Sequence, residues 1–137
     1  LAYDNPRLPQ ALIAAGEAMG RGDWIEIGLE TLDWICDRQT TAKGHFRPAG
    51  SEGMGIAYEQ RPFDQQPLEA QAALDACAAA HRVRPSRRWQ AHGLAAWNWF
   101  FGANDRGVVL ANPETGECRD GINPRGANLN CGAESIL

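Results

Sequence analysis

The stretch Glu69-Ala-Gln71-Ala-Ala-Leu-Asp75-Ala-Cys77-Ala-Ala-Ala80 decides the fold. It consists almost entirely of small residues, and alanine is the strongest helix former. Pro67 stands just ahead of it, where the first turn of a helix tolerates the missing proline N–H. We therefore predict a helix over about residues 66–82. Because the sides of this helix are thin, it can pack against several neighbours, and we expect it in an inner layer.

Bulky residues dominate the next predicted helix, over about residues 86–102. Its apolar residues are Trp89, Leu94, Trp97, Trp99, Phe100 and Phe101. We expect these side chains to cover the inner helix. Helical spacing also predicts helices over about residues 6–20 and 24–39, joined by a turn in which Asp23 is the expected N-cap. The predicted fold class is all-α, built from antiparallel helical hairpins.

Two irregular, glycine-rich segments follow the hairpins, over residues 40–63 and 103–127. Connections of this length in compact domains are usually functional or disordered. We expect the first of them to bring His45 and Glu52 over one end of the helices. A fifth helix should begin near Cys131 or Gly132.

Polar residues collect at three predicted helix starts. These are Asp4-Asn-Pro-Arg-Leu-Pro9, Asp64-Gln-Gln-Pro-Leu-Glu69 and Asn128-Leu-Asn-Cys-Gly-Ala-Glu-Ser135. Backbone N–H groups at a helix start have no intrahelical partner and can bind an anion or a hydroxyl group. Since inner helices should run in the same direction, we expect the three starts to converge on one polar site.

Carboxylates and amides in and near these stretches are the candidate site residues. Asp64 and Glu134 are the candidate catalytic pair, because glycoside chemistry typically uses two carboxylates on either side of the scissile bond. The candidate substrate-binding residues, whose donors and acceptors suit sugar hydroxyls, are Gln65, Gln66, Glu69, Asp120, Asn128 and Asn130. The alternative roles are structural: acids in a first turn stabilise the helix, and loop amides hydrogen-bond within their loop. Asp120 has a further alternative, a turn held by an ion pair with Arg119.

Composition narrows the classes of function. A net charge of −4 gives no electrostatic case for nucleic acid or an anionic membrane as partner. No apolar run approaches the roughly 20 residues of a membrane span. The basic run over residues 82–88 is interpreted as a solvated helix connection, with a phosphate or partner patch as the alternative.

The sequence lacks the cysteine, histidine and glycine motifs that are typical of metal and nucleotide binding. Cys36, Cys77, Cys118 and Cys131 form no C-x-x-C pair, and the chain has neither a phosphate-binding glycine loop nor a helix-borne histidine pair. We therefore expect no metal and no cofactor. Reduced thiols in a cytoplasmic protein are the default expectation.

Four motifs carry a resemblance to a known family. They are Phe63-Asp-Gln-Gln-Pro-Leu-Glu-Ala70, Trp97-Asn-Trp-Phe-Phe-Gly-Ala-Asn104, Gly116-Glu-Cys-Arg-Asp-Gly121 and Asn128-Leu-Asn-Cys-Gly-Ala-Glu-Ser135. Together they resemble the C-terminal half of the six-hairpin α/α-toroid domains of bacterial carbohydrate-active proteins. Many members of that family are glycosyltransferases or mannosyltransferase-like proteins, some of them fused behind a group 1 glycosyltransferase domain. The similarity covers residues 6–137, and the family pattern has glutamine where Cys131 stands.

The resemblance implies that residues 1–137 form a single α-hairpin domain that is a fragment of a larger toroid. It implies a saccharide or glycoconjugate as ligand and a glycosyltransferase-type or glycoside-processing protein. One alternative is a non-catalytic domain that binds glycan or acts as a scaffold. Another is a self-associating helical module, because open hairpin flanks expose apolar surface. The partner is then another copy of the chain or the remainder of the same polypeptide.

Overall fold

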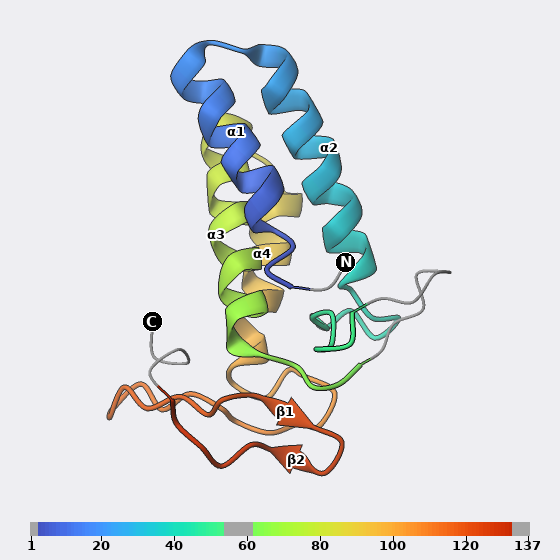
Figure 1. Cartoon of the computed structure of the whole chain (residues 1–137), viewed down its shortest axis with the longest axis vertical. Helices are drawn as coiled ribbons and strands as arrows, with labels where there is room; N and C mark the ends of the chain where they lie inside the picture. Colours follow the sequence, from blue (N-terminus) through green and yellow to red (C-terminus); the bar gives the residue numbers. More distant parts are fainter. Residues whose placement is uncertain (1–2, 54–61, 133–137) are drawn as a thin grey trace.

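The computed structural model describes residues 3–53 and 62–132, and four helices dominate it (Figure 1). The first hairpin consists of α1 (Arg7–Met19) and α2 (Gly22–Arg38). The second hairpin consists of α3 (Pro67–Val83) and α4 (Arg87–Trp99). Two short strands, β1 (Ile122–Asn123) and β2 (Gly126–Ala127), pair antiparallel near the end of the described chain. The prediction of a mostly helical fold built from hairpins is confirmed.

Helix α3 occupies the inner position that its small residues predict. It packs against α1, α2 and α4. Its buried residues include six alanines, namely Ala70, Ala72, Ala73, Ala76, Ala79 and Ala80. α1 and α3 run in the same direction, and both begin at the end of the molecule where the loops and the β-strands lie (Figure 1). The expected parallel arrangement of the inner helices is therefore observed.

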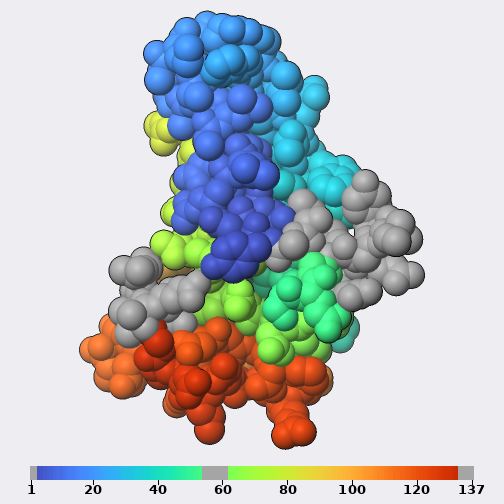
Figure 2. All heavy atoms as spheres, viewed as in Figure 1, coloured from blue at the N-terminus to red at the C-terminus, as the bar shows by residue number. Residues whose placement is uncertain are grey.

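The core has two parts. The upper part lies between the hairpins and comprises Ile13, Leu29, Leu32, Cys36, Ala76, Cys77, Ala80 and Trp89. The lower part joins the second hairpin to the loops and comprises Phe46, Ala70, Ala73, Ala96, Trp99, Leu110, Cys118 and Ile122. Figure 2 shows the later segments, in orange and red, forming the whole lower end of the molecule beneath the helices. The long loops are thus packed on the hairpin through apolar side chains.

The basic run spans the connection between α3 and α4 and is mostly exposed to solvent, as expected. Its arginines form ion pairs with acids of the first hairpin: Arg82 with Glu17, Arg84 with Glu26, and Arg88 with Asp33 and Asp37. These pairs are exposed, so each contributes little alone. These ion pairs show that the connection between α3 and α4 lies beside α1 and α2.

Several local expectations need correction or lie outside the described residues. Arg21, not Asp23, is the N-cap of α2; Asp23 lies in the first turn and pairs with Arg21 at 2.6 Å. Residues 128–132 are not helical, and the rest of the predicted fifth helix lies outside the described residues. In the described part of the chain, no helix has both the length and the apolar character needed to cross a membrane.

Candidate functional site

A polar cavity of about 440 Å³ lies at the N-terminal end of α3. Its walls come from the segment that leads into α3 and from the loop around β1. The lining residues are Asp64, Gln65, Gln66, Pro67, Leu68, Asp120, Gly121, Ile122, Asn123, Asn128 and Gly132. Five of the residues predicted from the sequence are among them: Asp64, Gln65, Gln66, Asp120 and Asn128. The structure therefore brings together two predicted stretches that lie more than 50 residues apart in the chain.

A pair of backbone hydrogen bonds holds the two walls together. Gln65 N donates to Ile122 O at 2.8 Å, and Ile122 N donates to Gln65 O at 2.9 Å. Gly121 makes this approach possible, because a Cβ there would lie 2.1 Å from the Gln65 carbonyl oxygen. Its φ of +150° also disfavours other residues. Glycine at position 121 is thus required by the cavity wall.

Asp120 faces the cavity and is not held by Arg119. Asp120 Oδ1 accepts a hydrogen bond from Gly132 N at 2.5 Å, and Asp120 N donates to Asn130 O at 2.9 Å. Arg119 instead donates to the carbonyl oxygen of Leu129 at 2.6 Å. Asp120 therefore lies at the cavity, and its predicted role in substrate binding stays a prediction.

The remaining candidates divide between the cavity and its surroundings. Asp64 is exposed at the mouth, and its carboxylate forms no ion pair or hydrogen bond with the described residues. Asn128 lines the cavity and accepts a hydrogen bond from Asn130 N at 3.1 Å, whereas Asn130 is exposed outside the lining. Glu134 lies outside the described residues. The roles predicted for these residues stay predictions.

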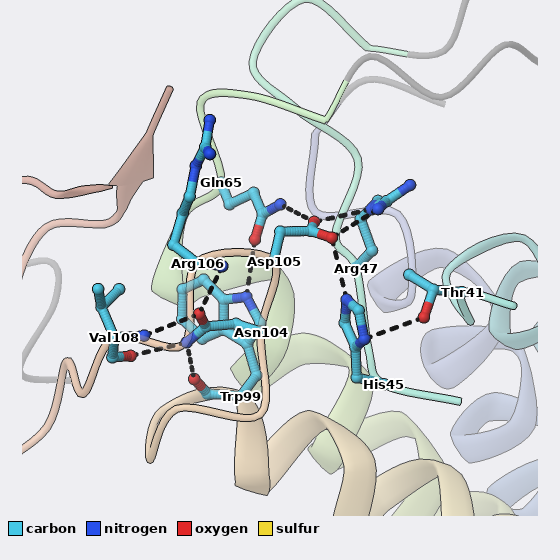
Figure 3. A network of polar contacts seen from close by, with 9 residues as sticks. All are labelled: Thr41, His45, Arg47, Gln65, Trp99, Asn104, Asp105, Arg106 and Val108. Carbon is cyan, nitrogen blue, oxygen red and sulfur yellow. Dashed lines mark hydrogen bonds and ion pairs between the residues drawn. The ribbon is translucent and has the colours of Figure 1, made fainter. Parts of the chain in front are cut away.

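Gln65 reaches the cavity through its main chain, while its buried carboxamide belongs to a separate network (Figure 3). Gln65 Nε2 donates to Asp105 Oδ2 at 2.6 Å, and Gln65 Oε1 accepts from Trp99 Nε1 at 2.9 Å. The side chain therefore joins α4 to the loop after it. This geometry supports a positioning role for Gln65.

Asp105 is the centre of that network (Figure 3). Its carboxylate accepts hydrogen bonds from Arg47 Nε at 2.7 Å and Arg47 Nη2 at 2.5 Å, and it lies 3.0 Å from His45 Nε2. Burial favours a higher pKa for Asp105, but the hydrogen bonds from Arg47, His45 and Gln65 outweigh it and lower the pKa to about 2. Asp105 is therefore ionised at neutral pH and binds two loops together. His45 lies at the loop end of the helices, as expected.

Glu69 also lies away from the cavity, buried near the start of α1. It accepts hydrogen bonds from Asn5 N at 3.4 Å, Asn5 Nδ2 at 3.2 Å and Gln39 Nε2 at 3.1 Å. Burial raises its pKa, and these hydrogen bonds offset part of that effect. The polar start of α1 therefore meets Glu69 rather than the cavity, which is formed by two of the three predicted stretches.

Sequence reasoning missed Asn123, Arg47 and Asp105. Asn123 lies in a two-residue strand, too short for any periodic pattern. Asp105 stands in Asn104-Asp-Arg-Gly107, which has the composition of a plain turn. Its partner Arg47 is 58 positions away, so only the folded chain reveals the pair.

The site offers carboxylates and amides but no evident metal site. Within residues 3–53 and 62–132, no group of three or more His, Cys, Asp and Glu side chains is arranged to hold a metal ion. All four cysteines are free. A comparison of the sequence with models of known protein families and with curated proteins finds no match.

Proposed function

We propose that this protein is the saccharide-binding domain of a carbohydrate-active, glycosyltransferase-type protein, and that the cavity at the start of α3 is its binding site. The observation that carries the proposal is the convergence of Asp64, Gln66, Asp120 and Asn128 on one cavity from two distant segments. The resemblance to the α/α-toroid family supports it. The parallel inner helices are compatible with a toroid fragment.

The chemistry of the lining suits a neutral, hydroxyl-rich ligand. No lysine, arginine or histidine of the described chain lines the cavity, so a phosphate or another anion would meet only carboxylates and amides. Carboxylates accept hydrogen bonds from hydroxyl groups, and amides both donate and accept them. Leu68, which is partly exposed, adds apolar surface for the carbon face of a ring. The volume lies within the roughly 300–1,000 Å³ typical of small-molecule sites.

Asp64 and Glu134 remain our proposed catalytic pair, one as general acid and the other as base or stabiliser. Asp64 lies at the cavity mouth, and Gly132, two positions before Glu134 in the sequence, is part of the lining. Asp120 is a further carboxylate in the same cavity. We assign Asp120 to substrate binding, because it lines the cavity and its position is held by the hydrogen bond from Gly132 N.

Binding is tested by titrating the protein with a panel of mono- and oligosaccharides while recording amide NMR shifts. We expect shifts at Gln66, Asp120 and Asn128, and an affinity loss of about tenfold or more in Asp64→Asn and Asn128→Ala. Glu114→Gln is the matched control, since it also removes one carboxylate charge but lies in an exposed turn outside the lining. Shifts confined to other surfaces, or variants that bind like the control, contradict the proposed site.

Turnover is tested separately with each saccharide that binds. Hydrolysis or transfer that is lost in Asp64→Asn and Glu134→Gln, even at saccharide concentrations that saturate each variant, supports the catalytic pair. Binding without turnover in the unaltered protein supports the non-catalytic glycan-binding alternative instead.

A further inference from the structure

The two hairpins are versions of one structural unit. A shift of 61 residues carries Pro6 onto Pro67 and Ile13 onto Leu74, and a shift of 65 residues carries Gly28 onto Gly93. The contacts agree with this alignment, because Gly28 lies against Ile13 in the first hairpin and Gly93 lies against Leu74 in the second. Corresponding positions can therefore be compared between the hairpins.

The face of the first hairpin that meets the second is fully buried. Leu29 and Leu32 of α2 are 3% and 0% exposed in the core between the hairpins, beside Cys36. The corresponding residues, shifted by 65, are Leu94 and Trp97 of α4 and Phe101 just after it. Leu94 is 58% exposed and Trp97 is 49% exposed. The second hairpin thus presents an apolar face at the positions through which the first hairpin packs on its neighbour.

This exposed face is hollowed along its length. One cavity of about 380 Å³ is lined mainly by Leu74, Trp97, Phe100, Phe101 and Cys118 together with polar residues at its rim. A second cavity of about 340 Å³ adjoins it, because both are lined by Leu74 and Trp97. We call the combined hollow the α3–α4 groove. Its shape and apolar character suit the ridge of side chains that a packed helix provides.

The opposite side of the molecule carries such ridges. Leu8, Leu12, Ala15 and Met19 follow helical spacing along α1 and form one apolar stripe. Another side of α1 bears Arg7 and Glu17, whose ion pairs reach α3. The stripe is therefore on the face turned away from the second hairpin.

Helix α2 extends the same outer face. Met19 of α1 is 65% exposed and Ile27 of α2 is 53% exposed. We call this surface, with Trp24 and Trp34, the α1–α2 outer face. Shifted by the same 61 and 65 residues, Ala15, Met19 and Trp24 correspond to Ala76, Ala80 and Trp89, which lie in the core between the hairpins. These three residues of the outer face therefore occupy positions whose equivalents form the interface within the chain.

We infer that a second copy of this chain docks head to tail, with its α1–α2 outer face in the α3–α4 groove of the first. The interface inside the chain supplies the argument, since both surfaces are the equivalents of surfaces already buried against each other there. If the second hairpin of one copy packs on the first hairpin of the next as the two hairpins pack within the chain, Leu94 and Trp97 of one copy are buried beneath Met19 and Ile27 of the next. Such a heterologous contact leaves one groove and one outer face open in a dimer, so further copies can add until a ring closes.

The test uses one substitution on each surface. Trp97→Glu disrupts the groove and Ile27→Glu disrupts the outer face; both residues are about half exposed, so the fold should persist, as circular dichroism can verify. We expect the unaltered chain to show a mass that rises with concentration in light scattering. Each variant alone should be monomeric, with association weakened about tenfold or more. Leu129→Glu, at a 75% exposed residue outside both surfaces, is the control and should associate like the unaltered chain.

A mixture of the two variants distinguishes head-to-tail association from symmetric pairing through one face. Trp97→Glu keeps an intact outer face and Ile27→Glu keeps an intact groove, so the equimolar mixture should form a dimer that grows no further. A dimer that persists in either variant alone would show symmetric pairing through one face and would overturn the head-to-tail arrangement. An unaltered chain that remains monomeric at every concentration would overturn self-association itself, whatever the result of saccharide titration.

Discussion

At the scale of single residues, two carboxylates near the lower end of the helices have pKa values that are shifted in opposite directions. Asp105 lies beside the Arg47 guanidinium, and its pKa falls to about 2. Glu69 accepts hydrogen bonds from the neutral side chains of Asn5 and Gln39, and its pKa rises because it is buried. A charged partner within reach therefore decides whether a buried acid supports or opposes folding at neutral pH.

For Asp105 we expect a stabilising charge that is lost in acid. The folded-state pKa lies below the ordinary value, so the contribution is complete above about pH 4 and disappears as pH falls towards 2. Asp105→Asn should lower the free energy of unfolding by about 1–2 kcal/mol at pH 7, allowing for partial solvent screening. Urea unfolding at pH 7 and pH 3 measures this, and the difference between variant and parent should shrink at pH 3. Asp23→Asn, at an exposed pair, is the control; an equal effect there would contradict the assignment.

For Glu69 the sign is reversed. Because its pKa is raised in the folded state, the folded protein binds the proton more tightly, and lowering the pH through that pKa should stabilise it. Glu69→Gln removes the buried charge, and the new amide can donate to Gln39 Oε1, which has no hydrogen-bond partner among residues 3–53 and 62–132. We expect the variant to be as stable as the parent at pH 7, or more stable by up to about 1 kcal/mol. Unfolding across about pH 4–8 tests this; a loss of about 2 kcal/mol or more would show that the charge itself is needed.

At the scale of elements, glycine sets how closely the helices of each hairpin approach. A Cβ at Gly28 would lie 2.6 Å from Ile13 Cγ1 and 3.1 Å from Pro9 O, whereas a Cβ at Gly93 would lie 3.5 Å from Cys77 Cβ, an ordinary contact. Gly28→Ala should therefore destabilise the protein by about 1–3 kcal/mol through overpacking. Gly93→Ala should stabilise it by about 0.5–1 kcal/mol through helix propensity. Thermal and urea unfolding of the two variants should give opposite signs, and matching signs would refute the argument.

The helices could be predicted from the sequence, whereas several contacts between distant segments could not. Proline at the start of α3 and the spacing of apolar residues predict the four helices, because these are local properties. The direction of the inner helices predicts that the starts of α3 and the last loop meet. The same reasoning places the start of α1 at that site, but Asn5 instead hydrogen-bonds with Glu69, 64 positions away. Long-range polar pairing has no sequence period, so the Asp105 network could not be predicted. The β1–β2 pair is local, but strands of two residues are too short to show a periodic pattern.

At the scale of the whole molecule, the first hairpin is held to the second by an apolar core framed by ion pairs. The pairs that cross the boundary are Arg7–Asp75, Arg82–Glu17, Arg84–Glu26 and Arg88 with Asp33 and Asp37. Most of their atoms are exposed, so salt should weaken them, while the apolar contacts of Leu29, Leu32 and Ala76 persist. The cavity, by contrast, is built entirely on the second hairpin and its loops. A change that loosens the first hairpin should therefore leave saccharide binding largely intact.

Cys36 and Cys77 face each other across that boundary, with their sulfur atoms 3.8 Å apart. The hydrogen bond from Cys77 and burial both raise the pKa of Cys36. The reactive thiolate of Cys36 is therefore disfavoured while the two hairpins are packed together. The alkylation rate of Cys36 and Cys77 therefore measures how often the two hairpins separate. The exposed Cys131 should react at once and serves as the internal control for the reagent. Mass spectrometry of timed iodoacetamide reactions should show slow labelling of Cys36 and Cys77 that accelerates in Gly28→Ala. Labelling of both at the rate of Cys131 would mean that the hairpins part freely.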